Sequence, residues 1–196
     1  MANAVETLTL AAFYFNNTAY AQRAVFLLRT WFLDENSSMN PNANFAQSIP
    51  GRCDGRGIGL IDFAKDWPVM IDCIKLLEWL GSWEATDAAA MHIWWTKWLQ
   101  WLWNSKNGHD ERAALNNHGS YYDVQTLAAA NYVGNQSIIA AICSEAATRR
   151  LDVQIGPNGT LPLEDKRTKS EAYHGSCDAW QRAGCAVVQY IWCALP

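Results

Sequence analysis

Residues 84–103, EATDAAAMHIWWTKWLQWLW, carry the strongest structural signal in the chain. Apolar side chains recur there at the spacing of an α-helix, and those on one side are Met91, Trp94, Trp95, Trp98 and Leu102. The stretch holds five Trp residues, which cannot all face solvent. It therefore predicts a long helix whose Trp side chains lie mostly in a core.

On both sides of this stretch, helical patterns alternate with loops, and no convincing series of strands is present. Helices are predicted over residues 2–15, 18–33, 68–81 and 135–153, and from residue 171 onward. Another is predicted to start directly after His118, where Ser120 and Asp123 have the form of a capping box, and to run to residue 133. Residues 34–56, 104–119 and 154–170 are predicted loops.

The succession of helix pairs and loops predicts an all-α fold. Antiparallel pairs joined by alternately short and long loops indicate an (α/α) toroid, as a full or incomplete barrel, or an irregular helical bundle. The chain has 196 residues, of which 50% are hydrophobic and 17% charged, which is typical of one globular domain. No internal repeat favours a solenoid.

Charge and composition narrow the classes of partner. The net charge is −4 with no basic face, so neither nucleic acid nor a membrane surface is an expected partner. No apolar run reaches the length of a membrane span, and no signal peptide is predicted at the N-terminus. Eleven Trp residues suggest stacking on sugar rings, although core packing explains most of them equally well.

The six cysteines form no CxxC pair and no zinc-site spacing, so no metal site is predicted. Cys73 and Cys143 have apolar neighbours and are expected to be buried free thiols. An even number of cysteines also permits disulfides, and the sequence leaves the redox compartment open.

A first candidate site is the segment 116–123, NNHGSYYD, at a predicted helix N-terminus. Free backbone N–H groups and the helix dipole attract an anion there. Asn116 and Asn117 can donate hydrogen bonds, and His118 can donate or accept a proton. The segment could therefore bind a carboxylate, or its polar side chains could simply cap the helix.

A second candidate site combines Arg167 and Lys169 with Tyr173, early in the last predicted helix. Arg167 can bind a carboxylate with two hydrogen bonds and can favour the phenolate form of a nearby Tyr. Arg149 and Arg150 precede this group, and solvated surface charge is the alternative for all these cations. Asn, His, Arg and Tyr together supply what β-elimination beside a uronate carboxylate needs: donors, a base and an acid, without a cofactor.

Three stretches resemble the alginate lyase family of α/α-toroid polysaccharide lyases, which act on alginate and glucuronan. They are MNPNANFAQSIPGRCDGRGIGLIDF (39–63), NNHGSYYDVQ (116–125) and NGTLPLEDKRTKSEAY (158–173). The resemblance covers residues 1–175 as one partial toroid domain and leaves 176–196 as an atypical tail. It implies an acidic polysaccharide substrate and a protein usually secreted or periplasmic.

The resemblance also implies roles for individual residues. Asn117 and Arg167 would neutralise the substrate carboxylate. His118 would assist or act as a base for one uronate epimer, and Tyr173 would be the acid and, in some substrates, the base. The implied substrate groove contains Gln47, Arg52, Arg56, Asn116, Tyr121, Tyr122 and Lys169.

Two other functions stay open. Family members extend further at both ends, so an incomplete toroid is expected, and such a chain could bind acidic polysaccharide without turnover. A helical glycoside hydrolase would need two carboxylates flanking the scissile bond, and Asp62, Asp66 and Asp123 are available. Uronate preference, endo or exo action and oligomeric state are not predicted.

Overall fold

The computed structural model describes residues 1–46, 51 and 66–163, and in this part of the chain every regular element is a helix. The elements are α1 (Ala2–Phe15), α2 (Thr18–Leu28), η1 (Arg29–Leu33), α4 (Asp66–Trp79), α5 (Ala85–Asn104), α6 (Lys106–Ala113), α7 (Asn117–Val133), α8 (Gln136–Ala146), η3 (Ala147–Leu151) and α9 (Asp152–Gln154). The η segments are π-helical turns that continue α2 and α8. The predicted all-α class is confirmed for these residues.

Two helical hairpins are closed by residues that tolerate a left-handed backbone. Asn16 ends α1 at φ 46°, and Gly134 ends α7 at φ 73°. The next helix starts at once in each case, because the Asn17 side chain accepts from the Ala19 amide and the Asn135 side chain accepts from the Ile138 amide. These short turns fold α2 back on α1 and α8 back on α7.

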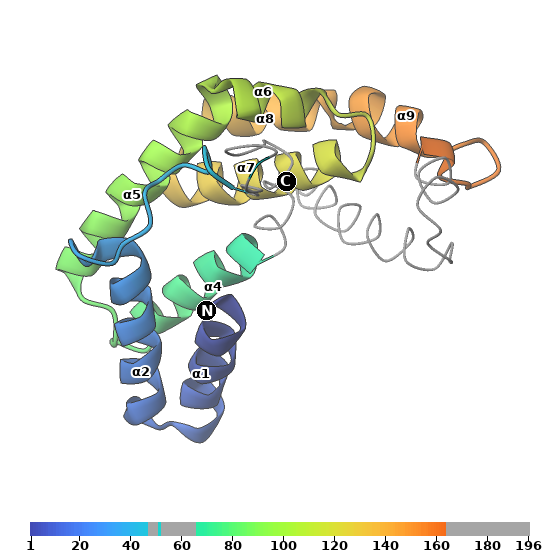
Figure 1. The fold of residues 1–196 in the computed structure, drawn as a ribbon. Coiled ribbons are helices and arrows are strands. Elements are labelled where there is room, and N and C mark those ends of the chain that lie inside the picture. Colours follow the sequence, from blue (N-terminus) through green and yellow to red (C-terminus); the bar gives the residue numbers. More distant parts are fainter. Residues whose placement is uncertain (47–50, 52–65, 164–196) are drawn as a thin grey trace.

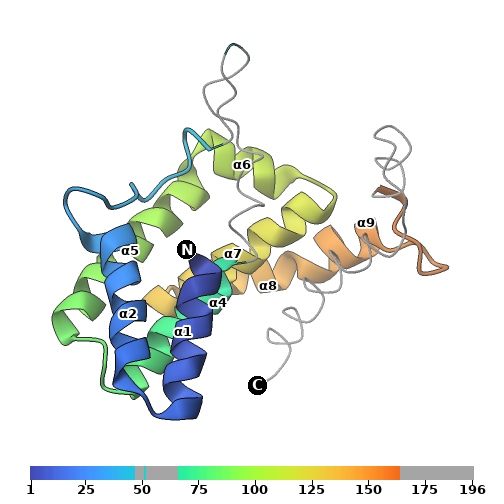
Figure 2. The same cartoon turned by 60° about the horizontal axis from the view of Figure 1, so that its bottom comes forward.

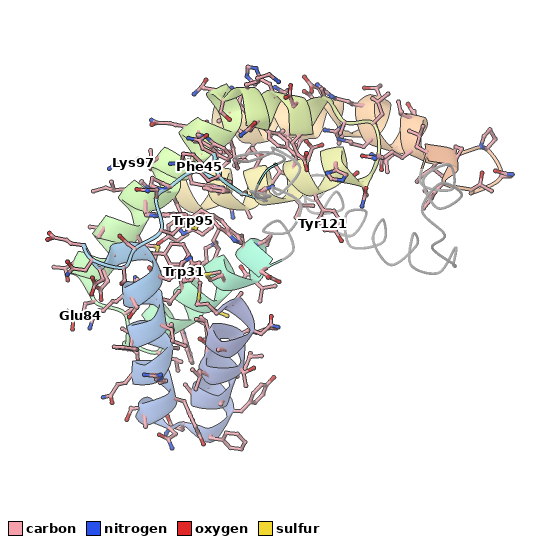
Figure 3. All side chains as sticks on the ribbon, in the orientation of Figure 1. Trp31, Phe45, Glu84, Trp95, Lys97 and Tyr121 are labelled. Carbon is pink, nitrogen blue, oxygen red and sulfur yellow. The ribbon has the colours of Figure 1, made fainter. Side chains whose placement is uncertain are left out.

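A cluster of Trp rings joins the hairpin α1–α2 to the rest of the molecule. Trp95 and Trp98 of α5 are fully buried, and Trp67 of α4 packs on Trp98 with ring centroids 4.2 Å apart. Figure 3 shows Trp95 on the inner side of α5, and its ring meets Phe32 of η1. The prediction that the Trp residues of 84–103 lie mostly in a core is confirmed.

The helices follow one another along an arc. In Figure 1, α1 and α2 form one end, α5 rises from them, and α6, α7 and α8 lie side by side toward the other end. Figure 2 gives the same order from a second direction, with the connection between α6 and α7 far from the tip of the hairpin α1–α2. This curved set of helix pairs agrees with part of an α/α toroid. None of the described helices is both long and apolar enough for a membrane span.

Two predictions about residues 104–123 are wrong. A helix, α6, occupies most of the predicted loop 104–119, and Ser105 caps it by accepting from the Gly108 amide. Helix α7 begins at Asn117 rather than after His118, with Asn116 as its N-cap. Ser120 and Asp123 form no capping box, because both side chains bond to the segment that follows α8.

The predicted thiol states differ between the two described cysteines. Cys73 is a buried free thiol, as predicted, and burial raises its pKa to about 11. Cys143, predicted to be a free thiol, is disulfide-bonded. Its position on α8 is only half-buried, although its neighbours in sequence are apolar.

Candidate active site

The candidate site is built on the first turn of α7. The Asn116 side chain caps the helix by accepting a hydrogen bond from the His118 amide at 3.1 Å. Asn117 and His118 therefore lie in the first helical turn, where the positive end of the helix dipole favours an anion. The segment is thus both a helix cap and a place where polar side chains gather, so the two interpretations of the sequence are compatible.

Behind His118 stands a carboxylate that sequence reasoning missed. The Nδ1 atom of His118 lies 2.7 Å from Oε1 of Glu111 on α6. Both side chains are buried, with relative exposures of 9% for His118 and 6% for Glu111. Which of the two groups donates in this contact depends on the tautomer of the imidazole. Glu111 was not predicted as a site residue, because the segment that forms α6 was predicted to be a loop.

A buried arginine fixes the chain that leads into α7. Arg150 of η3 donates from Nε and Nη2 to the two carboxylate oxygens of Asp123, at 2.7 and 3.0 Å. It also donates to the backbone carbonyls of Ala114 and Arg112, each at 3.0 Å. The guanidinium therefore ties the end of α6 and the α6–α7 connection to α7. For Arg150, an exposure of 1% excludes the alternative of solvated surface charge.

Further contacts close the site from the side of α9. Gln154 donates from its amide nitrogen to the Asn116 carbonyl at 3.0 Å and accepts from the Ser120 hydroxyl at 2.9 Å. Gly119 leaves no room for a side chain, since a Cβ there would lie 2.1 Å from the Ala114 carbonyl oxygen. The first turn of α7 is therefore in contact with Gln154 of α9 and, at Gly119, with the α6–α7 connection.

A partly exposed charge network borders this region. Arg112 and Arg149 both donate to Oε2 of Glu145, at 2.9 and 3.0 Å. Burial opposes ionisation of Glu145, but the two arginine hydrogen bonds outweigh it, so the pKa of the carboxyl is lowered. Arg112 also lies over the ring of Trp103, 4.5 Å from its centroid.

The two predicted groove tyrosines have different positions. Tyr121 is half-buried and projects from α7 on the side away from α6 and α8 (Figure 3). Tyr122 is fully buried, donates to the Leu102 carbonyl at 3.0 Å, and has a pKa raised to about 12 by its burial. Tyr122 therefore joins α7 to α5 inside the core, which corrects its assignment as a substrate contact.

The other predicted site residues lie outside the described part of the chain. They are Gln47, Arg52, Arg56, Arg167, Lys169 and Tyr173. The structure thus brings together Asn116, Asn117 and His118 and adds Glu111 behind them. Asp123, considered as a hydrolase carboxylate, is bound to Arg150, while Asp66 begins α4 and Asp62 is not described.

Metal ligation has no candidate in the described residues, where no group of three or more His, Cys, Asp or Glu side chains is arranged to hold an ion. The donors at the first turn of α7 are amides and an imidazole. Such a set suits an organic anion, which amide N–H groups and the helix N-terminus bind directly.

Comparison with known proteins identifies relatives of this arrangement. The family model described as alginate lyase matches residues 1–175. Among solved structures, the crystal structure of an alginate lyase from Bacteroides ovatus is 39% identical in sequence and superposes with a TM-score of 0.79. That match covers 83% of this chain and 43% of the Bacteroides chain, so the present chain spans less than half the length of that relative. No curated protein sequence matches the chain.

Proposed function

Because the chain belongs to the alginate lyase family, we propose that it takes part in cleaving a uronic-acid polymer, alginate or glucuronan, by β-elimination. Membership confirms the resemblance found in the motifs. The observation that carries the proposal is the first turn of α7, where Asn117 and His118 lie together and Glu111 backs the imidazole. These groups can bind a carboxylate and move a proton.

The proposed reaction begins with the substrate carboxylate at the first turn of α7. The Asn117 amide and the Arg167 guanidinium neutralise its charge, which increases as the proton on C5 is removed. The C5–H electron pair then forms the C4–C5 double bond, and the bond from C4 to the glycosidic oxygen breaks. The departing oxygen takes a proton from an acid, so the products are an unsaturated end and a free hydroxyl.

His118 and Tyr173 share the proton transfers in this proposal. The neutral imidazole of His118 removes the C5 proton when that proton and the leaving oxygen lie on opposite faces of the sugar. Tyr173 donates to the leaving oxygen, and it is also the base when both lie on one face. The roles of Arg167 and Tyr173 rest on the family resemblance, and so do groove contacts from Gln47, Arg52, Arg56 and Lys169.

A glycoside hydrolase is less well supported. Hydrolysis at a glycosidic bond needs two carboxyl groups that flank it, one of them able to give up a proton. Asp123 is committed to two hydrogen bonds from Arg150, and Glu111 bonds to His118. Both carboxylates are thus engaged by other side chains.

The proposal predicts ultraviolet absorbance from the new double bond when the chain is incubated with alginate or glucuronan. Asn117→Ala should lower the rate on the order of 10²–10³, because a positioned donor to the developing charge is lost. Asn131→Ala is the matched control, since Asn131 lies on the exposed side of the same helix. Equal rates for the two variants would contradict the role of Asn117.

A second pair of variants tests the acid. Tyr173→Phe removes only a hydroxyl, so it should abolish product formation while polysaccharide binding persists. Tyr20→Phe, at an exposed position on α2, should react like the native chain. An active Tyr173→Phe variant would remove Tyr173 from the mechanism. Binding of polysaccharide by the native chain with no product over long incubation would instead support a binding module.

We further propose that the protein works outside the cytoplasm. The support is twofold: the resemblance implies a secreted or periplasmic protein, and Cys143 is disulfide-bonded, a state that oxidising compartments favour. Degradation of an extracellular polymer would then place the chain in carbohydrate metabolism.

A further inference from the structure

We propose that Glu111 is a positioning residue that holds the His118 imidazole with its proton on Nδ1, so that Nε2 is the nitrogen that meets the substrate. The catalytic effect of this contact rests on the proposed elimination, but the contact itself does not. The contact itself, 2.7 Å between Nδ1 and Oε1, lies in the described part of the chain and connects two helices, α6 and α7.

The burial of the pair makes the contact strong. Both side chains are buried, so little water competes for either group. In such surroundings a hydrogen bond to an ionised group is stronger than in water, and it fixes the ring orientation as well as the tautomer. The imidazole of His118 is then ready to accept a proton at Nε2, with a negative charge already beside its other nitrogen.

The arginines near Glu111 form ion pairs with other carboxylates. Arg112, the next residue on α6, donates to Glu145 of α8. Arg150 of η3 donates to Asp123 of α7 and to two backbone carbonyls. Each of these arginines thus has a carboxylate of its own, and the Glu111 carboxylate bonds to the His118 imidazole. Glu111 therefore compensates the positive charge that forms on His118 when it takes the C5 proton.

The direct test is nuclear magnetic resonance of the chain labelled with ¹⁵N-histidine, at a pH well above the ordinary imidazole range. The His118 signals are identified by their loss in the His118→Gln variant. In the native chain they should show the proton on Nδ1. His109 is an internal reference of the opposite tautomer, because its Nε2 lies 2.8 Å from the Trp103 carbonyl, which can only accept. A native His118 protonated on Nε2 would overturn the proposal.

Replacing the carboxylate should release the tautomer. In Glu111→Gln the new amide can accept from Nδ1–H or donate to a bare Nδ1, so His118 should populate both tautomers. In Glu111→Ala the Nδ1 atom of His118 loses this hydrogen-bond partner, so the imidazole should again populate both tautomers. His109, on the same helix, should keep its signals and report that α6 is intact. Retention of a pure Nδ1–H form in both variants would show that Glu111 does not fix it.

Activity gives a second readout that separates this inference from the proposed function. Glu111→Gln should lower kcat about 10- to 100-fold with little change in KM, part of the ~10²–10⁴ that a positioned acid–base group contributes.

Asp110→Asn is the matched control, since Asp110 lies exposed on the same helix and pairs with Lys106. It should leave kcat and KM unchanged. An active native chain whose Glu111→Gln variant keeps its kcat would overturn the positioning role. An inactive native chain would remove the proposed function instead, and the tautomer measurement would then decide the inference alone.

Discussion

At the level of single residues, the site depends on Gly119, Glu111 and Arg150, whose roles come from their contacts with other helices. Gly119 follows His118 at a point where the α6–α7 connection and Arg150 both press against the first turn of α7. Asn116, Asn117 and His118 could be singled out from the sequence because a polar cluster before a helix is visible there. Glu111 and Arg150 could not, since burial and partners of charged residues depend on how distant segments pack.

The close packing at Gly119 predicts the effect of adding one methyl group. In Gly119→Ala the Cβ would lie 2.1 Å from the Ala114 carbonyl oxygen and 2.5 Å from Nη1 of Arg150. Backbone and guanidinium must both shift, so the free energy of unfolding should fall by about 1–3 kcal/mol in urea denaturation. Asn131→Ala, on the exposed side of α7, should stay within about 0.5 kcal/mol of the native value. Equal stability of the Gly119→Ala variant would contradict the packing described.

Glu145 should make stability depend on pH in the acid range. The arginine hydrogen bonds keep the folded-state pKa of its carboxyl below the ordinary value. The ionised group therefore stabilises the fold above the ordinary carboxyl range, and this contribution is lost as the pH falls through the folded-state pKa. Glu145→Gln should thus have a lower Tm than the native chain near pH ~7, and the difference should narrow below pH ~4. A difference that stays constant over this range would contradict the assignment.

At the scale of helices, the periodic and apolar elements were predictable and the polar ones were not. Helices 2–15, 18–33 and 84–103 agree with α1, with α2 and η1, and with α5, because their apolar stripes are long. Helix α6 is rich in charged and polar residues and contains Gly108, so it has no such stripe, and it forms through its Ser105 cap and its packing on α5 and α7. The start of α7 was misplaced because Asn116, not Ser120 with Asp123, caps it.

The contact between α7 and the segment that follows α8 should be stabilised by Arg150 far more than by its neighbour Arg149. Arg150→Gln leaves Asp123 buried without its bidentate partner, so we expect a loss of about 3–5 kcal/mol in the free energy of unfolding. Arg149→Gln removes a pair with Glu145 whose side chains are 34% and 42% exposed, and should cost below about 1 kcal/mol. Urea denaturation of the two variants checks the contrast. Similar losses would contradict the burial of Arg150.

At the scale of the whole molecule, the arc of helices places the candidate site far from the hairpin α1–α2 (Figure 1). The Trp cluster joins the hairpin to α5, while Glu111 of α6 contacts the His118 side chain of α7. The all-α class followed from the sequence because most helices are amphipathic. The curvature did not, since it arises from how each pair packs on the next. The groove residues Gln47, Arg52, Arg56 and Lys169 and the catalytic residues Arg167 and Tyr173 stay predictions.

If the chain cleaves uronic-acid polymers by elimination, as we propose, the masses of its products must differ from those of hydrolysis. Elimination splits the polymer without adding water, whereas hydrolysis adds one water molecule for each bond cut. Mass spectrometry of alginate and glucuronan oligosaccharides after incubation should show fragments whose masses sum to that of the substrate, one of each pair unsaturated. Fragments that together carry an added water would show hydrolysis instead of elimination.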